Sequence, residues 1–275
     1  MRIALISDIH GNTIALDAVL ADCSAHGIES YWFLGDYAAF GPEPAEVLER
    51  VTQLPEARFI RGNTDRYVVT AENLSPLIEA IRSKPERTEQ WISIATSIAW
   101  TRGVVTATGW FDWLAALPLE LRHTAPNGTR ILAAHAAPGT DDGEGMHPGR
   151  SNAELADLLE GCDADVVFVA HTHEALVRRV GSRTVVNLGS LSNPRGADVR
   201  ASYVLLEITE IDVNITPRRV AYDQARFADA LQRVRYPAVE HILDFQRGDH
   251  PGRAPHADHV AVQAGETVRV GPPSA

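Results

Sequence analysis

Five short apolar runs in this chain each end at residues of a type that binds metal ions. Runs of this length that are rich in Ile, Val, Leu and Phe are typical of buried parallel strands. Helical patterns separate the first three runs, which predicts parallel strands with right-handed crossovers and therefore an α/β fold. The runs and the residues that follow them are Arg2–Ser7 with Asp8 and His10, Tyr31–Gly35 with Asp36, Arg58–Gly62 with Asn63, Arg130–Ala134 with His135, and Val166–Ala170 with His171 and His173.

The side chains at the ends of these runs are expected to converge. In open α/β sheets, ligands bind beyond the carboxyl ends of the strands, so we expect all of them at one rim of one sheet. On a straight strand, Asp8 and His10 would share a face because they lie two residues apart. Seven oxygen and nitrogen ligands are too many for one ion and suit two ions that share a bridge. Asp36 is the natural bridge, since a carboxylate can give one oxygen to each ion.

The ligand types also predict the metal and the reaction. Imidazole nitrogens favour first-row transition ions over magnesium or calcium. We therefore expect two divalent ions among manganese, iron, zinc and nickel, with manganese favoured. Two such ions about 3.5–4 Å apart lower the pKa of a bridging water and hold a phosphoryl group for in-line attack. The pattern predicts a two-metal hydrolase in which a metal-bound hydroxide is the nucleophile.

The composition fits a globular enzyme and argues against several partners. A chain of 275 residues, 45% of them hydrophobic, can bury a substantial core. The net charge of −11 argues against a general nucleic-acid or anionic-membrane surface, whereas metal ions would still attract a small phosphorylated substrate. No run approaches the roughly 20 apolar residues of a membrane helix, and Ser7 and Asp8 interrupt the N-terminal run before a secretion signal could form. We expect a cytoplasmic protein.

The chain is predicted to form one domain, residues 1–247, that contains a helical insertion at about residues 65–117. This insertion carries four of the five tryptophans. It could pack on the sheet or act as a cap that shapes a substrate pocket, and the two alternatives are compatible. Its apolar surface could also support a dimer, so the oligomeric state stays open.

The second half of the chain is predicted to be richer in strands. Segments 183–187, 202–208 and 212–219 fit strands, and we expect the last ones to pair with one another in a mostly antiparallel second sheet. The tail, residues 248–275, is rich in Gly and Pro and nearly lacks large apolar residues. That composition predicts disorder.

Taken together, the motifs resemble the calcineurin-like metallophosphoesterase superfamily, and most closely its small bacterial phosphodiesterase branch. The resemblance covers roughly residues 1–220 and implies a two-sheet β-sandwich flanked by helices, with a dinuclear metal site at its rim. The implied activity is phosphodiester hydrolysis. The motifs that carry the resemblance are Asp8-Ile9-His10-Gly11-Asn12, Gly35-Asp36, Gly62-Asn63-Thr64-Asp65, His135 and His171-Thr172-His173.

The resemblance also implies roles for single residues. One metal would be held by Asp8, His10, Asp36 and His173, and the other by Asp36, Asn63, His135 and His171. The run from Asn187 to Arg195 resembles a family loop near the site, and Arg195 is a candidate contact for the substrate phosphate. Asn12 has two interpretations, as the N-cap of the following helix or as a second phosphate contact.

The chain departs from the family pattern at Thr64. Many relatives have a histidine directly after the Gly-Asn pair, where it acts as a general acid or stabilises the transition state. We assign Thr64 to the catalytic set with Asp36 and Asn63, but a hydroxyl cannot donate a proton near neutral pH as an imidazole can. His147, in the Gly- and Asp-rich loop at 138–149, could substitute, and a solvent-exposed histidine without a role is the alternative.

Other functions remain open at this stage. A protein phosphatase or a dinucleoside-polyphosphate hydrolase would stay within the same family. A non-catalytic scaffold is a rival from another class, since the scaffold subunit of retromer resembles this family. A scaffold would be expected to have lost ligands, whereas all seven ligand positions here keep coordinating side chains.

Overall fold

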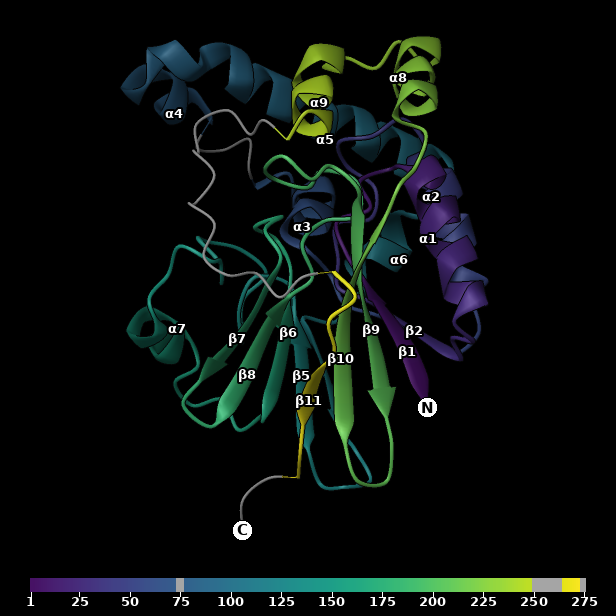
Figure 1. The fold of residues 1–275 in the computed structure, drawn as a ribbon. Coiled ribbons are helices and arrows are strands. Elements are labelled where there is room, and N and C mark those ends of the chain that lie inside the picture. The colour runs from purple at the N-terminus through teal and green to yellow at the C-terminus, as the bar shows by residue number, and fades with distance from the viewer. Residues whose placement is uncertain (73–76, 249–263, 273–275) are drawn as a thin grey trace.

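Two β-sheets lie face to face at the centre of the molecule, and helices cover their outer faces and one end (Figure 1). The computed structural model describes residues 1–72, 77–248 and 264–272. The first sheet has the order β11 (Val268–Val270), β10 (Val213–Val220), β9 (Ala201–Ile208), β1 (Arg2–Ile6), β2 (Ser30–Phe33) and β3 (Ala57–Phe59). The second has the order β4 (Glu120–Thr124), β5 (Arg130–Ala134), β6 (Val166–Val169), β8 (Arg183–Asn187) and β7 (Leu176–Val180). The predicted α/β sandwich with flanking helices is confirmed.

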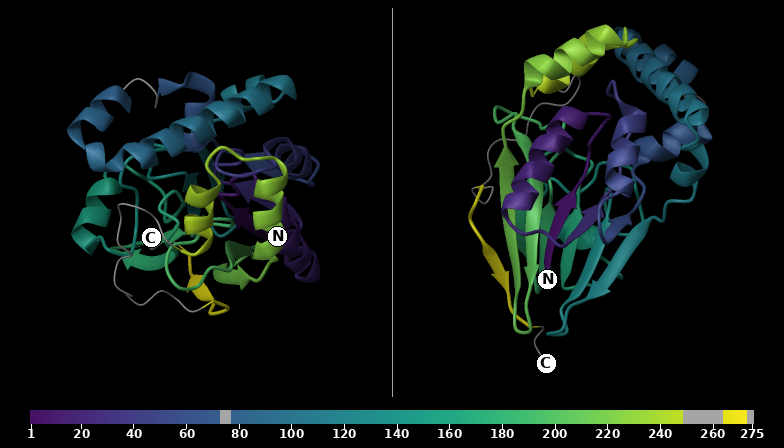
Figure 2. Two further views of the ribbon diagram at one scale, coloured as in Figure 1. Left: turned by 90° about the horizontal axis from the view of Figure 1, so that it is seen from above. Right: turned by 90° about the vertical axis from the view of Figure 1, so that its right-hand side faces the viewer.

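The helices fall into groups by the surface that they cover. Helices α1 (Thr13–Ala25) and α2 (Pro44–Thr52) pack outside the first sheet, and α7 (Asn152–Leu158) packs outside the second. Between β3 and β4 the described residues form α3 (Asn63–Thr70), α4 (Leu77–Ser83), the short 3₁₀ helix η2 (Pro85–Arg87), α5 (Thr88–Ala107) and α6 (Phe111–Ala115). Two further helices, α8 (Gln224–Arg233) and α9 (Val239–Gln246), join α5 across the end of the sandwich towards which β1 points (Figures 1 and 2).

Strand β1 shows why the apolar runs become buried strands. Successive side chains of a strand point to opposite faces of the sheet. Ile3 and Leu5 accordingly join the core between the two sheets, and Ala4 and Ile6 join the core beneath α1. Both faces are covered, which is why this run is continuously apolar instead of alternating with polar residues.

The placement of the late strands corrects one expectation. Strand β9 pairs antiparallel with β1, through Leu5 and Val204 among others, and β10 pairs with β9. These strands therefore extend the first sheet and do not form a second one. Strand β8 pairs in parallel with β6 in the other sheet. The apolar pattern of a strand identifies it as a strand, but the partner strand is chosen by long-range packing that the pattern does not contain.

The C-terminal segment corrects another expectation. Residues Val268–Val270 form β11 on the edge of the first sheet, with Val270 opposite Val213 of β10. The prediction of a disordered tail at 248–275 is therefore wrong for this part, because Val270 is buried against the inter-sheet core once β10 offers an edge. The remainder of that prediction, residues 249–263 and 273–275, lies outside the described residues. Within the described part of the chain, no helix has both the length and the apolar composition to cross a membrane.

Candidate metal centre

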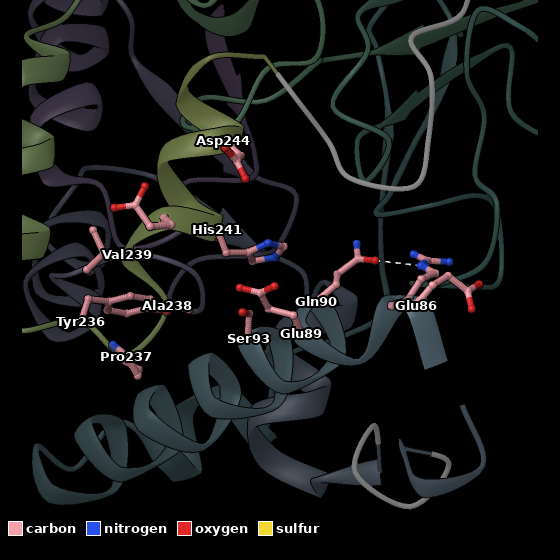
Figure 3. A pocket seen from close by; sticks show the side chains of 12 residues that line it. Glu86, Glu89, Gln90, Ser93, Tyr236, Pro237, Ala238, Val239, His241 and Asp244 are labelled. Atoms are coloured by element: carbon pink, nitrogen blue, oxygen red, sulfur yellow. Dashed lines mark hydrogen bonds between the residues drawn. The ribbon is translucent and has the colours of Figure 1, made fainter. Parts of the chain in front are cut away.

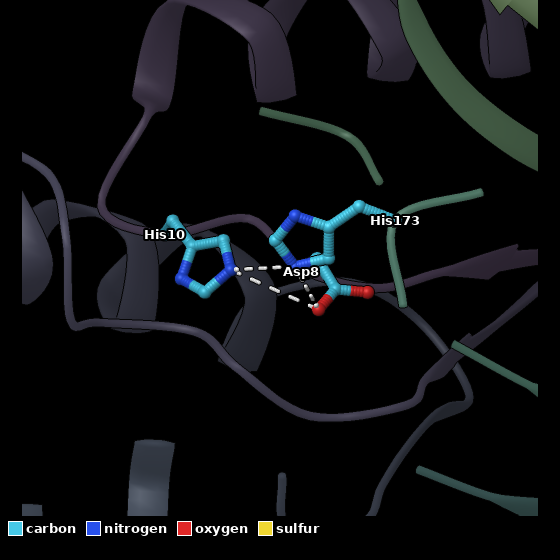
Figure 4. A group of neighbouring side chains, drawn as sticks. All are labelled: Asp8, His10 and His173. Atoms are coloured by element: carbon cyan, nitrogen blue, oxygen red, sulfur yellow. Dashed lines mark hydrogen bonds and ion pairs between the residues drawn. The ribbon is translucent and has the colours of Figure 1, made fainter. Parts of the chain in front are cut away.

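The loops that follow five strands bring the predicted ligands together. The predicted single rim of one sheet is wrong in detail, because the ligands come from both sheets. Asp8, His10, Asp36 and Asn63 follow β1, β2 and β3 of the first sheet, and His135, His171 and His173 follow β5 and β6 of the second. The ligating atoms of Asp8, His10 and His173 all lie within 4.8 Å of one another, as do those of Asp8, Asp36 and His135 (Figure 4 shows the first group).

Five of the seven predicted ligands have a left-handed backbone that is not strand-like. The φ angles are 54° at Asp8, 48° at His10, 58° at Asp36, 66° at His171 and 63° at His173. Strand β1 ends at Ile6, so the expectation that Asp8 and His10 share a face of a straight strand is wrong. Non-glycine residues adopt this conformation at a cost, and such strain concentrates at functional sites. Tertiary hydrogen bonds hold it here, including the one from the His10 N–H to the Asp36 carbonyl at 3.0 Å.

Two imidazoles of the first group turn their lone pairs towards each other. The Nδ1 atom of His10 lies 2.9 Å from the Ala39 carbonyl, and that of His173 lies 2.8 Å from the Asn193 carbonyl. A carbonyl only accepts, so both Nδ1 atoms carry the hydrogen and both Nε2 atoms have lone pairs. These two Nε2 atoms lie 3.4 Å apart. Two lone pairs at this distance repel each other unless a cation lies between them.

A similar arrangement surrounds Asn63, whose side-chain oxygen is faced by ring nitrogens of His135 and His171. His135 donates from Nδ1 to the Leu34 carbonyl at 2.6 Å, and His171 donates from Nε2 to the Gly143 carbonyl at 2.8 Å. Their other ring nitrogens lie 3.2 and 2.9 Å from Asn63 Oδ1, which is itself an acceptor. A backbone partner that fixes the tautomer of each imidazole is the usual outer support of a metal ligand. The donor set therefore fits a divalent cation.

Asp8 gives an independent test of that fit. The residue is fully buried, and neither carboxylate oxygen has a hydrogen-bond partner among the described residues. His173 Nε2 lies 3.1 Å from Asp8 Oδ1. Burial raises the pKa of Asp8 to about 6. A buried carboxylate without hydrogen bonds is costly, and a cation is the partner that its surroundings lack.

Asp36 lies between His10 and His135. Its Oδ2 atom lies 3.4 Å from His135 Nε2 and 3.9 Å from His10 Nε2, and its Oδ1 atom accepts the Thr64 N–H at 3.0 Å. This position between the groups is the one expected of a bridging carboxylate.

Residues 1–210 match the calcineurin-like phosphoesterase superfamily domain. The chain belongs to the calcineurin-like phosphoesterase superfamily. Among similar proteins, the chain is 27% identical over 252 residues to the uncharacterized protein MJ0912 of Methanocaldococcus jannaschii, and the match covers 86% of this chain and 93% of that one.

Two solved structures have the same fold as this chain. One is a metallophosphoesterase from Sphaerobacter thermophilus, with 24% identity, a TM-score of 0.67 and coverage of 89% of this chain and 99% of that one. The other is the hypothetical protein PH1004 from Pyrococcus horikoshii OT3, with 20% identity, a TM-score of 0.72 and coverage of 92% and 99%. At these identities the likeness concerns the fold alone.

The predicted substrate contacts differ in their placement. Asn12 is buried, its Oδ1 atom accepts the Ala15 N–H at 2.9 Å as the N-cap of α1, and its amide donates to Ser192 Oγ at 2.9 Å. The structure thus gives Asn12 the capping role, and a contact with phosphate stays a prediction. Arg195 lies beside the metal centre, since its N–H donates to the His173 carbonyl at 3.1 Å and its buried side chain pairs with Glu174 at 3.9 Å.

Thr64 is buried at the start of α3, and its Oγ1 atom has no hydrogen-bond partner among the described residues. Its side chain borders a cavity of about 380 Å³ that Asn63 also lines. The loop that carries His147 is tied to α3, because Arg66 pairs with Asp141 at 3.0 Å and with Asp142 at 2.9 Å. The loop therefore acts as a support for α3 and for His171, whose ring donates to Gly143.

Sequence reasoning missed two contributors to this part of the molecule. Asp65 accepts backbone N–H groups from Asp36, Tyr37 and Gly62 and so fixes the loop after β2. Its spacing of three residues from Gly62, the N-cap of α3, is the one signal in the sequence. His241 of α9 lines the cavity beside Thr64. Nothing in the local sequence marks it, because α9 reaches the cavity only through the tertiary fold.

Proposed function

We propose that this chain is a phosphodiesterase that depends on two divalent metal ions, with manganese as the favoured metal. The observation that carries the proposal is the facing pair of imidazole lone pairs at His10 and His173 beside the unpartnered carboxylate of Asp8. One ion would be held by Asp8, His10, Asp36 and His173, and the other by Asp36, Asn63, His135 and His171. The ions would supply Lewis acidity and an activated water.

The residues of the chain would each have a defined task. Asp36 would hold the two sites together, and the Thr64 N–H fixes its orientation through Oδ1. The charge of Arg195, next to His173, would attract the substrate phosphate. Attack by water forms one P–O bond while the P–O bond to the leaving group breaks. The leaving oxygen would take its proton from solvent, because the Thr64 hydroxyl has too high a pKa to supply one at neutral pH.

The scaffold alternative has less support. A scaffold would not need the unpartnered Asp8 carboxylate or the facing Nε2 lone pairs of His10 and His173, and both features destabilise a protein that binds no cation. A protein phosphatase or dinucleoside-polyphosphate hydrolase would use the same metal centre, so only substrate comparison separates these activities.

The deciding experiment combines metal analysis with a substrate panel. Protein stripped with a chelator and reconstituted with Mn²⁺ is analysed by mass spectrometry of its metal content. It is then assayed with bis(p-nitrophenyl) phosphate, p-nitrophenyl phosphate and a dinucleoside polyphosphate. The proposal predicts two ions per chain and the highest kcat/KM on the diester. Trace metal after reconstitution, or no turnover of any phosphate ester, would refute it.

A further inference from the structure

A cavity next to the metal centre has the lining of a binding site for an aromatic group. It measures about 380 Å³, within the range of small-ligand pockets. Asn63 and Thr64 of α3, Trp91 of α5 and Phe245 of α9 are among the residues that line it. The ring of Phe40, another lining residue, lies 5.7 Å from that of His10, so the cavity directly adjoins the first metal group.

Three polar atoms of the residues around this cavity lack hydrogen-bond partners among the described residues. They are Thr64 Oγ1, Trp91 Nε1 and His241 Nε2. His241 is only 8% exposed, and its ring packs against that of Phe245 with a centroid distance of 4.6 Å. Buried polar groups in folded proteins are nearly always paired, which makes these atoms available to an occupant with hydrogen-bonding atoms.

His241 also lines a second, outer cavity between α5 and α9. In Figure 3 its ring projects from α9 towards Glu89 and Gln90 of α5. The outer cavity is acidic, since its lining includes Glu86, Glu89, Glu240 and Asp244 and, among the described residues, only one cationic side chain, that of Arg87. Like charges repel, so a phosphate is disfavoured here, whereas the amino groups of a heteroaromatic ring can donate to these carboxylates.

From these observations we infer that the 380 Å³ cavity beside Asn63 and Thr64 binds the base of a nucleotide whose phosphate lies at the metal centre. The inference rests on the proposed phosphoesterase function and adds the class of substrate to it. The base would stack on Trp91 and Phe245, and its ring nitrogens or amino group would pair with His241. Aromatic stacking platforms of this kind hold a base whatever its identity, and the hydrogen bond orients it. Trp91 and His241 are then specificity residues and not catalytic ones.

The test measures binding and not turnover. AMP, which carries base and phosphate, ribose 5-phosphate, which lacks the base, and adenosine, which lacks the phosphate, are titrated into the Mn²⁺-loaded protein by calorimetry. We expect AMP to bind about tenfold or more tightly than ribose 5-phosphate, since a stacked base typically contributes that much. Trp91→Ala and His241→Phe should lower AMP affinity and leave ribose 5-phosphate affinity unchanged.

His123→Phe is the matched control, because His123 is a half-buried histidine on β4 whose ring packs against Trp32 at 5.7 Å and whose Nε2 atom is also unpartnered among the described residues. It should bind AMP as the unaltered protein does. His241→Phe keeps the ring against Phe245, which guards against simple misfolding, and retained metal content checks this.

The possible outcomes separate the two proposals. Equal affinity for AMP and ribose 5-phosphate would overturn the base site while leaving the phosphoesterase proposal intact. The base site would also be overturned if His241→Phe and His123→Phe weakened AMP binding equally. If neither phosphate bound to the metal-loaded protein and no phosphate ester was hydrolysed, both proposals would fall.

Discussion

The carboxylate of Asp65 accepts the backbone N–H of Asp36 at 2.7 Å, so one buried carboxylate fixes the position of another. Burial and the charge of Asp36 raise the pKa of Asp65 to about 7. Its carboxylate accepts three backbone N–H groups, those of Asp36, Tyr37 and Gly62. The orientation of the proposed bridging ligand thus depends on a residue that coordinates no metal itself.

The substitution Asp65→Asn should therefore weaken both folding and metal binding. An asparagine offers one acceptor oxygen, and its amide hydrogens would face backbone donors, so at least one N–H loses its partner. We expect the free energy of unfolding to fall by about 1–3 kcal/mol and the affinity for Mn²⁺ to fall about 10–100-fold. Urea denaturation and metal titration measure the two effects. Asp112→Asn, in the exposed first turn of α6, is the control and should change neither.

Replacing the proposed bridge should remove activity. Asp36→Asn leaves one neutral oxygen where a carboxylate faces both ligand groups, so one metal site should lose occupancy. Turnover of bis(p-nitrophenyl) phosphate should fall below about a tenth of the unaltered rate even at saturating Mn²⁺. Metal content per chain should fall from two ions towards one. The exposed Asp157→Asn variant on α7 should keep full activity. Near-normal turnover by Asp36→Asn would argue against a bridging role.

The rate should depend steeply on the leaving group, because Thr64 cannot protonate it. A series of aryl and alkyl phosphodiesters gives the slope of log kcat/KM against leaving-group pKa. Thr64→His restores the family residue, and the adjoining cavity provides space for the larger ring. We expect this variant to gain most on poor leaving groups, by an amount up to the 10²–10⁴-fold that general acid catalysis typically gives.

Thr64→Val is the control for that series, since it keeps the shape of the threonine without the hydroxyl. Its slope should match that of the unaltered protein. A shallow slope in the unaltered protein would instead indicate that another group donates the proton.

Acid should destabilise the fold through Asp22 of α1. Burial raises the pKa of this carboxyl, but hydrogen bonds from Arg218 and Tyr203 outweigh burial and hold the pKa below 3.8. His26, 3.7 Å away, is its other titratable partner. A lowered pKa in the folded state gives stability that is present above the unfolded pKa and lost as the pH falls through the folded value. Asp22→Asn should thus cost stability at neutral pH and progressively less below about pH 4. Urea denaturation across this range tests it, and a difference independent of pH would contradict it.

Four of the five ligand-bearing strands, β1, β2, β5 and β6, were predictable because each is a mostly buried run bounded by polar residues. Segments Arg130–Ala134 and Arg183–Asn187 are strands with the predicted limits. The edge strands β4, β7 and β11 were missed, since edge strands expose one side and carry charged residues such as Arg122 and Arg179 that weaken the apolar pattern. Sheet membership was also missed, because it is decided between segments far apart in sequence.

The convergence of the ligands was predictable, but the way in which they converge was not. Left-handed backbone at residues such as Asp8 and His173 opposes local preference, so only the surrounding contacts hold it. Gly62 illustrates such a contact, since a Cβ there would lie 2.0 Å from Asp36 Oδ1. His241 could not be assigned from the sequence for a related reason. The residues that line the cavity with it come largely from α3 and α5, and helical spacing within α9 does not identify them.

The predicted ligands come from both sheets of the sandwich, so bound ions would cross-link the two sheets. Separation of the two sheets would then require release of the ions. Removal of the ions by a chelator would therefore lower the melting temperature, because binding to the folded state stabilises it. The supply of metal in the cell would govern the lifetime of the folded chain as well as its rate of turnover.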